Sequence, residues 1–473
     1  VARAQKAVET LRRHKSYRRV YPFDTHHVLQ VEGLTGHPMS DAAPLTATAG
    51  MDRVKAPSAL GDLVSLVLRY AFNTLGPISI AGAHFLTSLL FLRFLPPAQF
   101  GLFSFVFVVV PFALSMGGAL FGAALVNSAN GKVPMTAGEL AAYMKANLVY
   151  ACLATIAIFG LMIAGTASVA LAAIVSLYGA LMTIRWFARC HAYAVHQMPR
   201  AIVSDLIYSS VLVGSLGILT FTHNLTPIFA ASALVLCSAC AVTGFGRQFL
   251  RVQTSALWEG SLRAFLPIWR DLARWSLLGV ISTELTANAH AYLVTLISGP
   301  KAFALLAVGS LFMRPASLVM TALPDAERAS MARALNAGKF ADTMRTVFQF
   351  RVAGLIVLAG TAVLSAVIMI WFPQLILKRG YDEASVIAVV CMWVAIMAIR
   401  ALRTPESILL QAAGEFRPLA SASVNSSVVS LAFTTILLLA FGPIISMTGV
   451  MMGEIVMAAQ IFMQARKWRA RHA

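Results

Sequence analysis

Apolar and polar stretches alternate along this chain. From residue 73 onward, apolar runs of about 20 residues, the length that crosses the hydrocarbon core of a bilayer, are separated by short polar intervals. We expect twelve membrane-spanning helices, near 73–95, 100–126, 146–166, 168–187, 201–222, 227–245, 277–298, 301–323, 349–372, 384–403, 418–441 and 445–464. The pattern predicts an all-α polytopic membrane protein.

The polar interval 246–276 has six predicted spans on either side. It is basic and contains Arg247, Arg251, Arg263, Arg270 and Arg274. We interpret it as a cytoplasmic linker with an amphipathic helix, between an N-terminal six-helix lobe at 59–245 and a C-terminal six-helix lobe at 277–465. The intervals 128–145 and 325–346 are expected to form short amphipathic helices on the inner membrane surface.

The two ends of the chain are polar. Residues 1–58 are interpreted as a disordered basic tail, part of which would lie upstream of the true start if translation begins at Met51. Residues 466–473 form a short basic tail.

Composition excludes a soluble domain, since hydrophobic residues make up 59% of the chain and charged residues only 12%. The net charge of +18 does not indicate a nucleic-acid partner, because the basic residues lie in the intervals between apolar runs. Along the chain, intervals rich in Lys and Arg alternate with intervals that contain few of them. The positive-inside rule places the basic intervals in the cytoplasm. Both termini are basic and lie on that side, so we expect both to be cytoplasmic.

The two halves contain similar sequences in the same order. AGELAAYMK at 137–145 is matched by AGKFADTMR at 337–345. Arg200, Ser204, Ser209 and Ser210 recur as Arg417, Ser421, Ser426 and Ser427, and Pro97 and Phe100 recur as Pro300 and Phe303. Repeats of six spans share one orientation, as in transporters built from parallel repeats. We expect two lobes around a cavity lined by the first, second, seventh and eighth spans.

No nucleotide-binding, zinc-binding or hydrolase motif occurs in the sequence. We therefore expect a transporter rather than an enzyme, with no cofactor or metal, driven by a proton or sodium gradient or by removal of the product.

Polar residues inside the predicted spans are the candidates for function, because such groups face protein or a water-filled cavity. Glu284 and Asn288 lie one turn apart in the seventh span, with His290 nearby, and the first span contains Asn73 and His84. We interpret the polar residues of the seventh span as lining the cavity, with hydrogen bonding between packed helices as the open alternative. Asn73 and His84 are further candidates for the cavity, although for His84, a lone histidine in its span, a packing role inside the lobe is favoured.

Two arginines are further candidates for the cavity. Arg314 precedes Pro315, which bends a helix, and Arg351 lies within the ninth span. A guanidinium can bind phosphate oxygens through two parallel hydrogen bonds. Glu454 and Asp205, together with Glu284, are candidates for binding a coupling ion. Arg400 and Arg403 are expected to extend toward the inner membrane interface.

The segment between the first two spans reads Arg93-Phe94-Leu95-Pro96-Pro97-Ala98-Gln99-Phe100-Gly101-Leu102. It resembles the Arg-x-Leu-Gly-Pro-x-x-Phe/Tyr-Gly-Leu motif of the bacterial polysaccharide transporter family, with Pro96 in place of the usual glycine. That family contains the O-antigen and exopolysaccharide flippases and belongs to the multidrug/oligosaccharidyl-lipid/polysaccharide exporter superfamily. Arg93, Pro97, Phe100 and Gly101 carry the resemblance.

The resemblance implies a flippase of the bacterial inner membrane. Its substrate would be an undecaprenyl-pyrophosphate-linked oligosaccharide for surface polysaccharide or lipopolysaccharide synthesis, and its partners membrane lipids and other assembly proteins, such as a polymerase or chain-length regulator. A multidrug exporter of the same fold is the first alternative. A membrane-embedded polymerase or glycosyltransferase is the second.

Overall fold

The helices form two groups that lie side by side. The computed structural model describes residues 59–129, 135–166, 168–372 and 381–472, so the N-terminal tail lies outside the described residues. The N-terminal lobe contains α2 (Ala59–Phe94), α3 (Pro97–Gly117), the π-helical turn η2 (Gly118–Gly122), α4 (Ala123–Ala129), α5 (Ala137–Thr166), α6 (Val169–Ala194), α7 (Met198–Phe221), α8 (Pro227–Thr243) and α9 (Arg247–Ala256). The C-terminal lobe contains α11 (Arg274–Ser298), α12 (Pro300–Phe312), α13 (Arg314–Asn336), α14 (Phe340–Trp371), α16 (Glu383–Ala412), α17 (Phe416–Phe441) and α18 (Pro443–His472).

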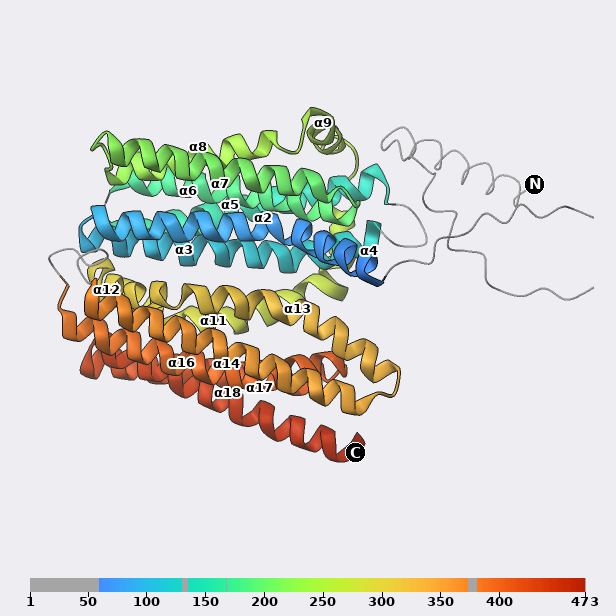
Figure 1. Cartoon of the computed structure of the whole chain (residues 1–473). Helices are drawn as coiled ribbons and strands as arrows, with labels where there is room; N and C mark the ends of the chain where they lie inside the picture. Colours follow the sequence, from blue (N-terminus) through green and yellow to red (C-terminus); the bar gives the residue numbers. More distant parts are fainter. Residues whose placement is uncertain (1–58, 130–134, 167, 373–380, 473) are drawn as a thin grey trace, which may run out of the picture.

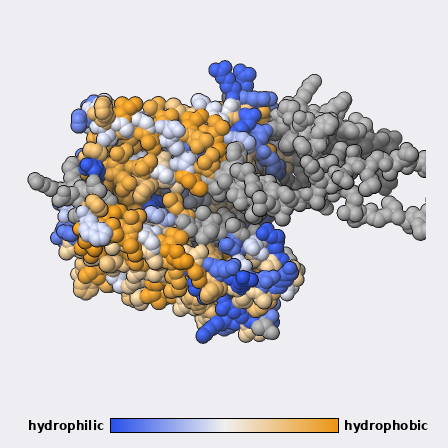
Figure 2. All heavy atoms as spheres, viewed as in Figure 1, coloured by the Kyte–Doolittle hydropathy of each residue, from blue (hydrophilic) through white to orange (hydrophobic). Residues whose placement is uncertain are grey.

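Figure 1 shows the long helices running roughly parallel, the N-terminal lobe in blue to green and the C-terminal lobe in yellow to red. We call the end that holds α9, the α13–α14 turn and the C-terminus the basic end. The other end, where α3 and α12 begin, is the opposite end. Figure 2 shows apolar side chains over the body of the visible face and hydrophilic ones gathered at the basic end.

Apolar side chains on the outer surface indicate contact with lipid. Ile156, Phe221 and Leu439 are 68%, 87% and 69% exposed. In water such a surface would cause aggregation, whereas a bilayer solvates it. The chain is therefore a multi-pass membrane protein with the all-helical fold that the sequence predicts.

Among the described residues, nine helices are long and apolar enough to cross a membrane, or up to ten if the bent pair α8–α9 is one span. The expected total was twelve. The difference arises at the predicted spans 277–298 and 301–323. In α11 the described apolar run covers Ser276–Leu285, because the side chains at 275 and 286 lie outside the described residues, and the next helix breaks at Met313 after a 13-residue α12. For these two segments the twelve-span expectation stays a prediction.

The amphipathic surface helices expected at 128–145 and 325–346 are absent as separate elements from the described part of these intervals. Instead, α13 continues to Asn336, and α14 begins at Phe340 after a tight turn. Similarly, α5 begins at Ala137 and runs into its span. A helix of 32 residues such as α14 is about 48 Å long. The polar segments are therefore the ends of helices that extend beyond the bilayer.

The linker begins with α9, which is grouped above with the N-terminal lobe because it packs against that lobe, and the rest of the linker does the same. After α9, which lies at 93° to α8, it forms the short helices η3 (Leu262–Phe265), α10 (Leu266–Ile268) and η4 (Trp269–Ala273). Lys145 of α5 donates to the Gly260 carbonyl at 2.7 Å. The Phe265 ring packs against Phe121 and Tyr143, with ring centroids 5.7 Å apart in each pair. These contacts fix the linker to α5 and η2.

The lobes meet at the opposite end, where α3 packs against α12. Pro97 begins α3 and Pro300 begins α12, as befits a residue that lacks an N–H. A Cβ on Gly101 would overlap the Pro300 carbonyl oxygen. The segment that resembles the flippase motif thus contacts its own repeat in the other half. Phe100 is buried at this contact, and Arg93 is exposed at the end of α2.

Candidate functional site

A chain of hydrogen bonds runs through the core of the N-terminal lobe. His84 of α2 shares a hydrogen bond of 2.8 Å with the Tyr208 hydroxyl of α7, which shares one of 3.0 Å with Tyr178 of α6. The His84 ring also stacks on Phe107 at 4.9 Å between centroids. His84 therefore joins three helices of one lobe, and it is close enough to Arg314 of the other lobe for an electrostatic interaction.

Asp205 accepts hydrogen bonds from two arginines of α6. The distances are 2.5 Å to Arg185 Nη2 and 3.1 Å to Arg189 Nε. Asp205 is fully buried, and Arg185 is 1% exposed. A carboxylate that binds two guanidinium groups has its charge balanced inside the lobe. This placement makes Asp205 part of an internal ion-pair network between α6 and α7.

The C-terminal lobe repeats this arrangement twice. Glu454 of α18 accepts from Arg400 Nε at 2.6 Å and Arg403 Nε at 2.9 Å, both on α16, so these arginines do not extend to the interface as expected. Glu406 of α16 accepts from Arg351 of α14 and, at 2.9 Å, from Arg469 of α18. Both carboxylates are 1% exposed. Arg351 is thus paired within its lobe, which leaves it less able to bind a substrate phosphate.

The polar residues of α11 divide between two faces. Asn288 Nδ2 donates to Glu284 at 2.7 Å, as the spacing of four residues allows. Leu277, Glu284, Asn288 and Tyr292 follow one another at intervals of seven, four and four, so they share one helical face. His290 lies on a different face, 3% exposed, with its ring 5.5 Å from that of Trp393. The structure therefore brings Glu284 and Asn288 together but places His290 in the packed core.

Arg314 lies at the break between α12 and α13. Its side chain is exposed, and none of the carboxylates in the described ranges pairs with it. It interacts electrostatically with His84 of α2, so it lies near the N-terminal lobe. Among the described residues, Arg314 is thus an exposed cation near both lobes without a carboxylate partner.

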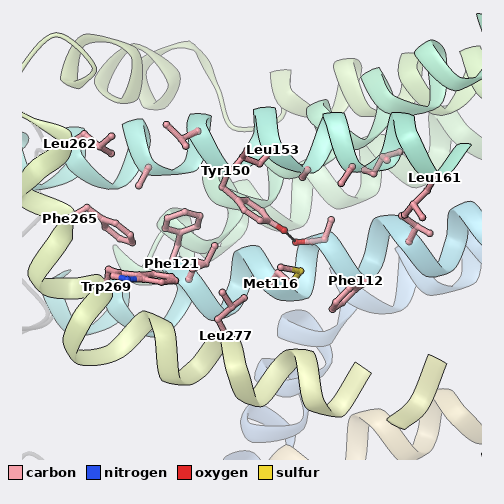
Figure 3. Close-up of a pocket in the computed structure, with 18 of the residues that line it drawn as sticks. Phe112, Met116, Phe121, Tyr150, Leu153, Leu161, Leu262, Phe265, Trp269 and Leu277 are labelled. Carbon is pink, nitrogen blue, oxygen red and sulfur yellow. Dashed lines mark hydrogen bonds between the residues drawn. The ribbon is translucent and has the colours of Figure 1, made fainter. Parts of the chain in front are cut away.

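A groove of about 780 Å³ lies between the lobes and is shown in Figure 3. We call it the inter-lobe groove. The N-terminal lobe provides residues of α3, η2 and α5, the linker closes one end, and Leu277 and Tyr292 of α11 form the other wall. Of the spans predicted to line the cavity, the second and seventh contribute to this groove, together with α5 and the linker. The cavity predicted between spans one, two, seven and eight stays a prediction.

Some predicted residues remain untested, and some functional candidates were missed. The Asn73 side chain lies outside those that the structure describes. The sequence interpretation missed Arg185, Arg189, Glu406 and Arg469 as partners of buried charges. One signal was available: the Arg185–Arg189 and Arg400–Arg403 pairs lie on equivalent spans, the fourth of each half. Among the described residues, no group of three or more His, Cys, Asp or Glu side chains could hold a metal ion.

Comparison with known proteins gives the fold. No known protein family and no curated protein matches the chain, but solved structures do. One is a multidrug resistance MATE family transporter of the MOP superfamily in an inward-facing conformation, with a TM-score of 0.66 and 14% identity, covering 85% of this chain and 95% of that one. The chain has the MOP transporter fold.

Two further structures with the MOP fold carry other functions in their names. The lipid II flippase MurJ, in an inward closed conformation, matches with a TM-score of 0.62 and 12% identity over 83% of this chain and 87% of its own. A MOP superfamily transporter from Pyrococcus furiosus, described as having a binding pocket of reversed polarity, matches with a TM-score of 0.54 and 14% identity over 86% and 96%. These neighbours are transporters. Because their sequences are only 12–14% identical to this chain, the likeness shows the fold alone.

Proposed function

We propose that this protein is a flippase that moves an anionic, lipid-linked oligosaccharide across the bacterial inner membrane for surface polysaccharide synthesis. The two lobes would rock about the space between them, with the basic end in the cytoplasm. The observation that carries the proposal is Arg314, an exposed guanidinium near both lobes with no carboxylate partner among the described residues.

The balance of charge inside the lobes supports an anionic substrate. Asp205, Glu406 and Glu454 are each neutralised by two arginines, so they offer no free negative charge to a cation. A drug exporter for cationic compounds needs accessible carboxylates. Glu284 is the exception, since Asn288 is its hydrogen-bond partner. We assign it to the binding of a coupling proton or sodium ion.

The structural neighbours are compatible with this substrate class. The name of one describes a flippase for lipid II, and that of another describes a reversed pocket polarity. The MOP fold therefore accommodates substrates other than cationic drugs.

The test compares a deletion strain of the source bacterium with strains expressing variants. Deletion should remove surface polysaccharide and leave the lipid-linked repeat unit in the cytoplasmic leaflet. Arg314→Gln should lower translocation about tenfold or more, because a hydrogen bond to a charged group contributes about 1.5–3 kcal/mol. Arg314→Lys should retain part of it. Arg345→Gln, which removes an exposed arginine of α14 at the basic end, is the matched control.

Two results would contradict the proposal. Normal polysaccharide with altered resistance to cationic dyes would support the drug exporter. A repeat unit that crosses the membrane but stays unpolymerised would support a polymerase.

A further inference from the structure

The walls of the inter-lobe groove are apolar over most of its length. Phe112, Met116 and Leu161 line one part, and Phe121 and Leu277 another, as Figure 3 shows. Such walls do not replace the hydrogen bonds of water or of a sugar, so the ligand that suits them is a hydrocarbon.

The polar atoms of the groove do not change this conclusion. The Tyr150 hydroxyl donates its proton to the Ala113 carbonyl within the wall, so it has no further hydrogen to donate to a ligand. The Tyr292 hydroxyl is buried and has no partner among the described residues. One hydroxyl among so many apolar side chains is compatible with a chain carrying few polar groups.

The groove is continuous with the lipid-facing surface. Val149 and Leu153 line it and are 49% and 61% exposed, and Ile156 next to them on α5 is 68% exposed. A hydrocarbon chain can therefore enter from the bilayer without crossing water.

The groove is elongated and has a cation at one end. On α5 its lining extends from Ala146 to Leu161, a distance of about 22 Å at 1.5 Å per residue. Arg263 lines the end closed by the linker, and the hydrogen bond from Lys145 to Gly260 holds the linker in place. The arginine can thus contact a phosphate whose chain lies along α5.

We propose that the inter-lobe groove binds the single long hydrocarbon chain of the phosphate-bearing lipid substrate, with Arg263 at the phosphate end. This assignment rests on the proposed function. It places the chain at the edge of the bundle between α5 and α11, while the hydrophilic headgroup occupies the space near Glu284, Asn288 and Arg314.

Photo-crosslinking tests the groove without transport. The purified full chain in nanodiscs is irradiated with a polyprenyl phosphate that carries a diazirine on its chain, and the labelled peptides are identified by mass spectrometry. We expect labels on segments 146–161 and 262–277. Leu153→Trp, which fills the groove from its open side, should reduce them about tenfold, and Arg263→Gln should weaken binding of the probe by about the same factor.

Matched controls separate the groove from the general lipid surface. Leu236→Trp changes a lipid-facing residue of α8 that is 51% exposed and lies outside the groove, so it should leave labelling unchanged. Arg251→Gln on α9 removes a basic residue away from the groove and should also have no effect. Labels spread evenly over the lipid-facing helices and insensitive to Leu153→Trp would overturn the proposal.

Two further outcomes are decisive. Equal labelling by a diazirine-bearing phosphatidylglycerol would assign the groove to a bilayer lipid and overturn the substrate assignment. If the protein translocates lipid-linked sugar but its groove is not labelled, the assignment of the groove is refuted and the proposed function stands. If the groove peptides are labelled but the protein translocates no lipid-linked sugar, the proposed function is refuted and the groove still binds a hydrocarbon chain.

Discussion

At the scale of single residues, the protein separates its charges into two kinds. Three buried carboxylates each bind two arginines within one lobe and hold helices together. Arg314 and Glu284 lack such partners in the described part of the chain, and Glu284 shares a helical face with Leu277 and Tyr292, which line the inter-lobe groove. Charges that are fully paired contribute to packing, whereas these two can respond to a ligand.

Removing one partner of a buried ion pair should be costly. Asp205→Asn leaves Arg185 buried with its charge uncompensated, so we expect a loss of about 3–5 kcal/mol. The fall in thermal unfolding temperature of the purified protein measures it. The double variant Asp205→Asn with Arg185→Met should recover part of the loss, because it also removes the buried cation.

Glu415→Gln is the control for this prediction. Glu415 pairs with Arg471 at 2.9 Å, but their side chains are 28% and 60% exposed. An exposed pair contributes about 0–1 kcal/mol. Equal destabilisation by Asp205→Asn and Glu415→Gln would mean that the ionic core of the N-terminal lobe contributes little to stability.

The pairing of Glu284 with an amide alone leads to a prediction about coupling. Glu284→Gln keeps the hydrogen bond to Asn288 but removes the ionisable group. We expect translocation to persist at a reduced rate and to lose its dependence on an imposed proton or sodium gradient. Flux in proteoliposomes with and without the gradient measures this. Asp205→Asn should retain gradient dependence in whatever protein folds, so its loss there would assign coupling to Asp205.

At the scale of helices, the sequence predicts the fold better than the site. Runs of apolar residues identify the spans because a bilayer imposes their length, and the spacing of Glu284 and Asn288 predicts their contact. The partners of Asp205 and Glu454 lie on other helices, and nothing local in the chain relates Arg400 to Glu454. The extent of α13 was also missed, because a polar helix that continues past the membrane resembles a separate surface helix.

The crossing of α3 and α12 gives a prediction about helix packing. Gly101→Ala places a methyl group against the Pro300 carbonyl, so one helix must move. We expect a destabilisation of about 1–3 kcal/mol, measured by thermal unfolding. Gly160→Ala on α5 is the control. Its Cβ meets open space, and alanine favours a helix over glycine by roughly 0.5–1 kcal/mol. A Gly101→Ala protein as stable as the control would show that this contact yields easily.

At the scale of the whole molecule, the two lobes touch through equivalent segments. The Pro97–Gly101 region contacts the Pro300–Ala304 region, its repeat in the other half. The contact closes the opposite end, whereas the inter-lobe groove separates α5 from α11 toward the linker. If the lobes are rigid bodies, weakening the contact between α3 and α12 must change the distance between the lobes at both the opposite end and the basic end.

Spin labels at the two ends test this coupling. In a background without the five native cysteines, one pair joins Trp258→Cys and Arg345→Cys at the basic end, and another joins Phe221→Cys and Phe441→Cys at the opposite end. Gly101→Val should lengthen the distance at the opposite end and shorten it at the basic end, as rocking of rigid lobes requires. Gly160→Ala should change neither. A change confined to the opposite end would show local fraying of α3 and α12, and the rocking mechanism would then need a pivot other than this contact.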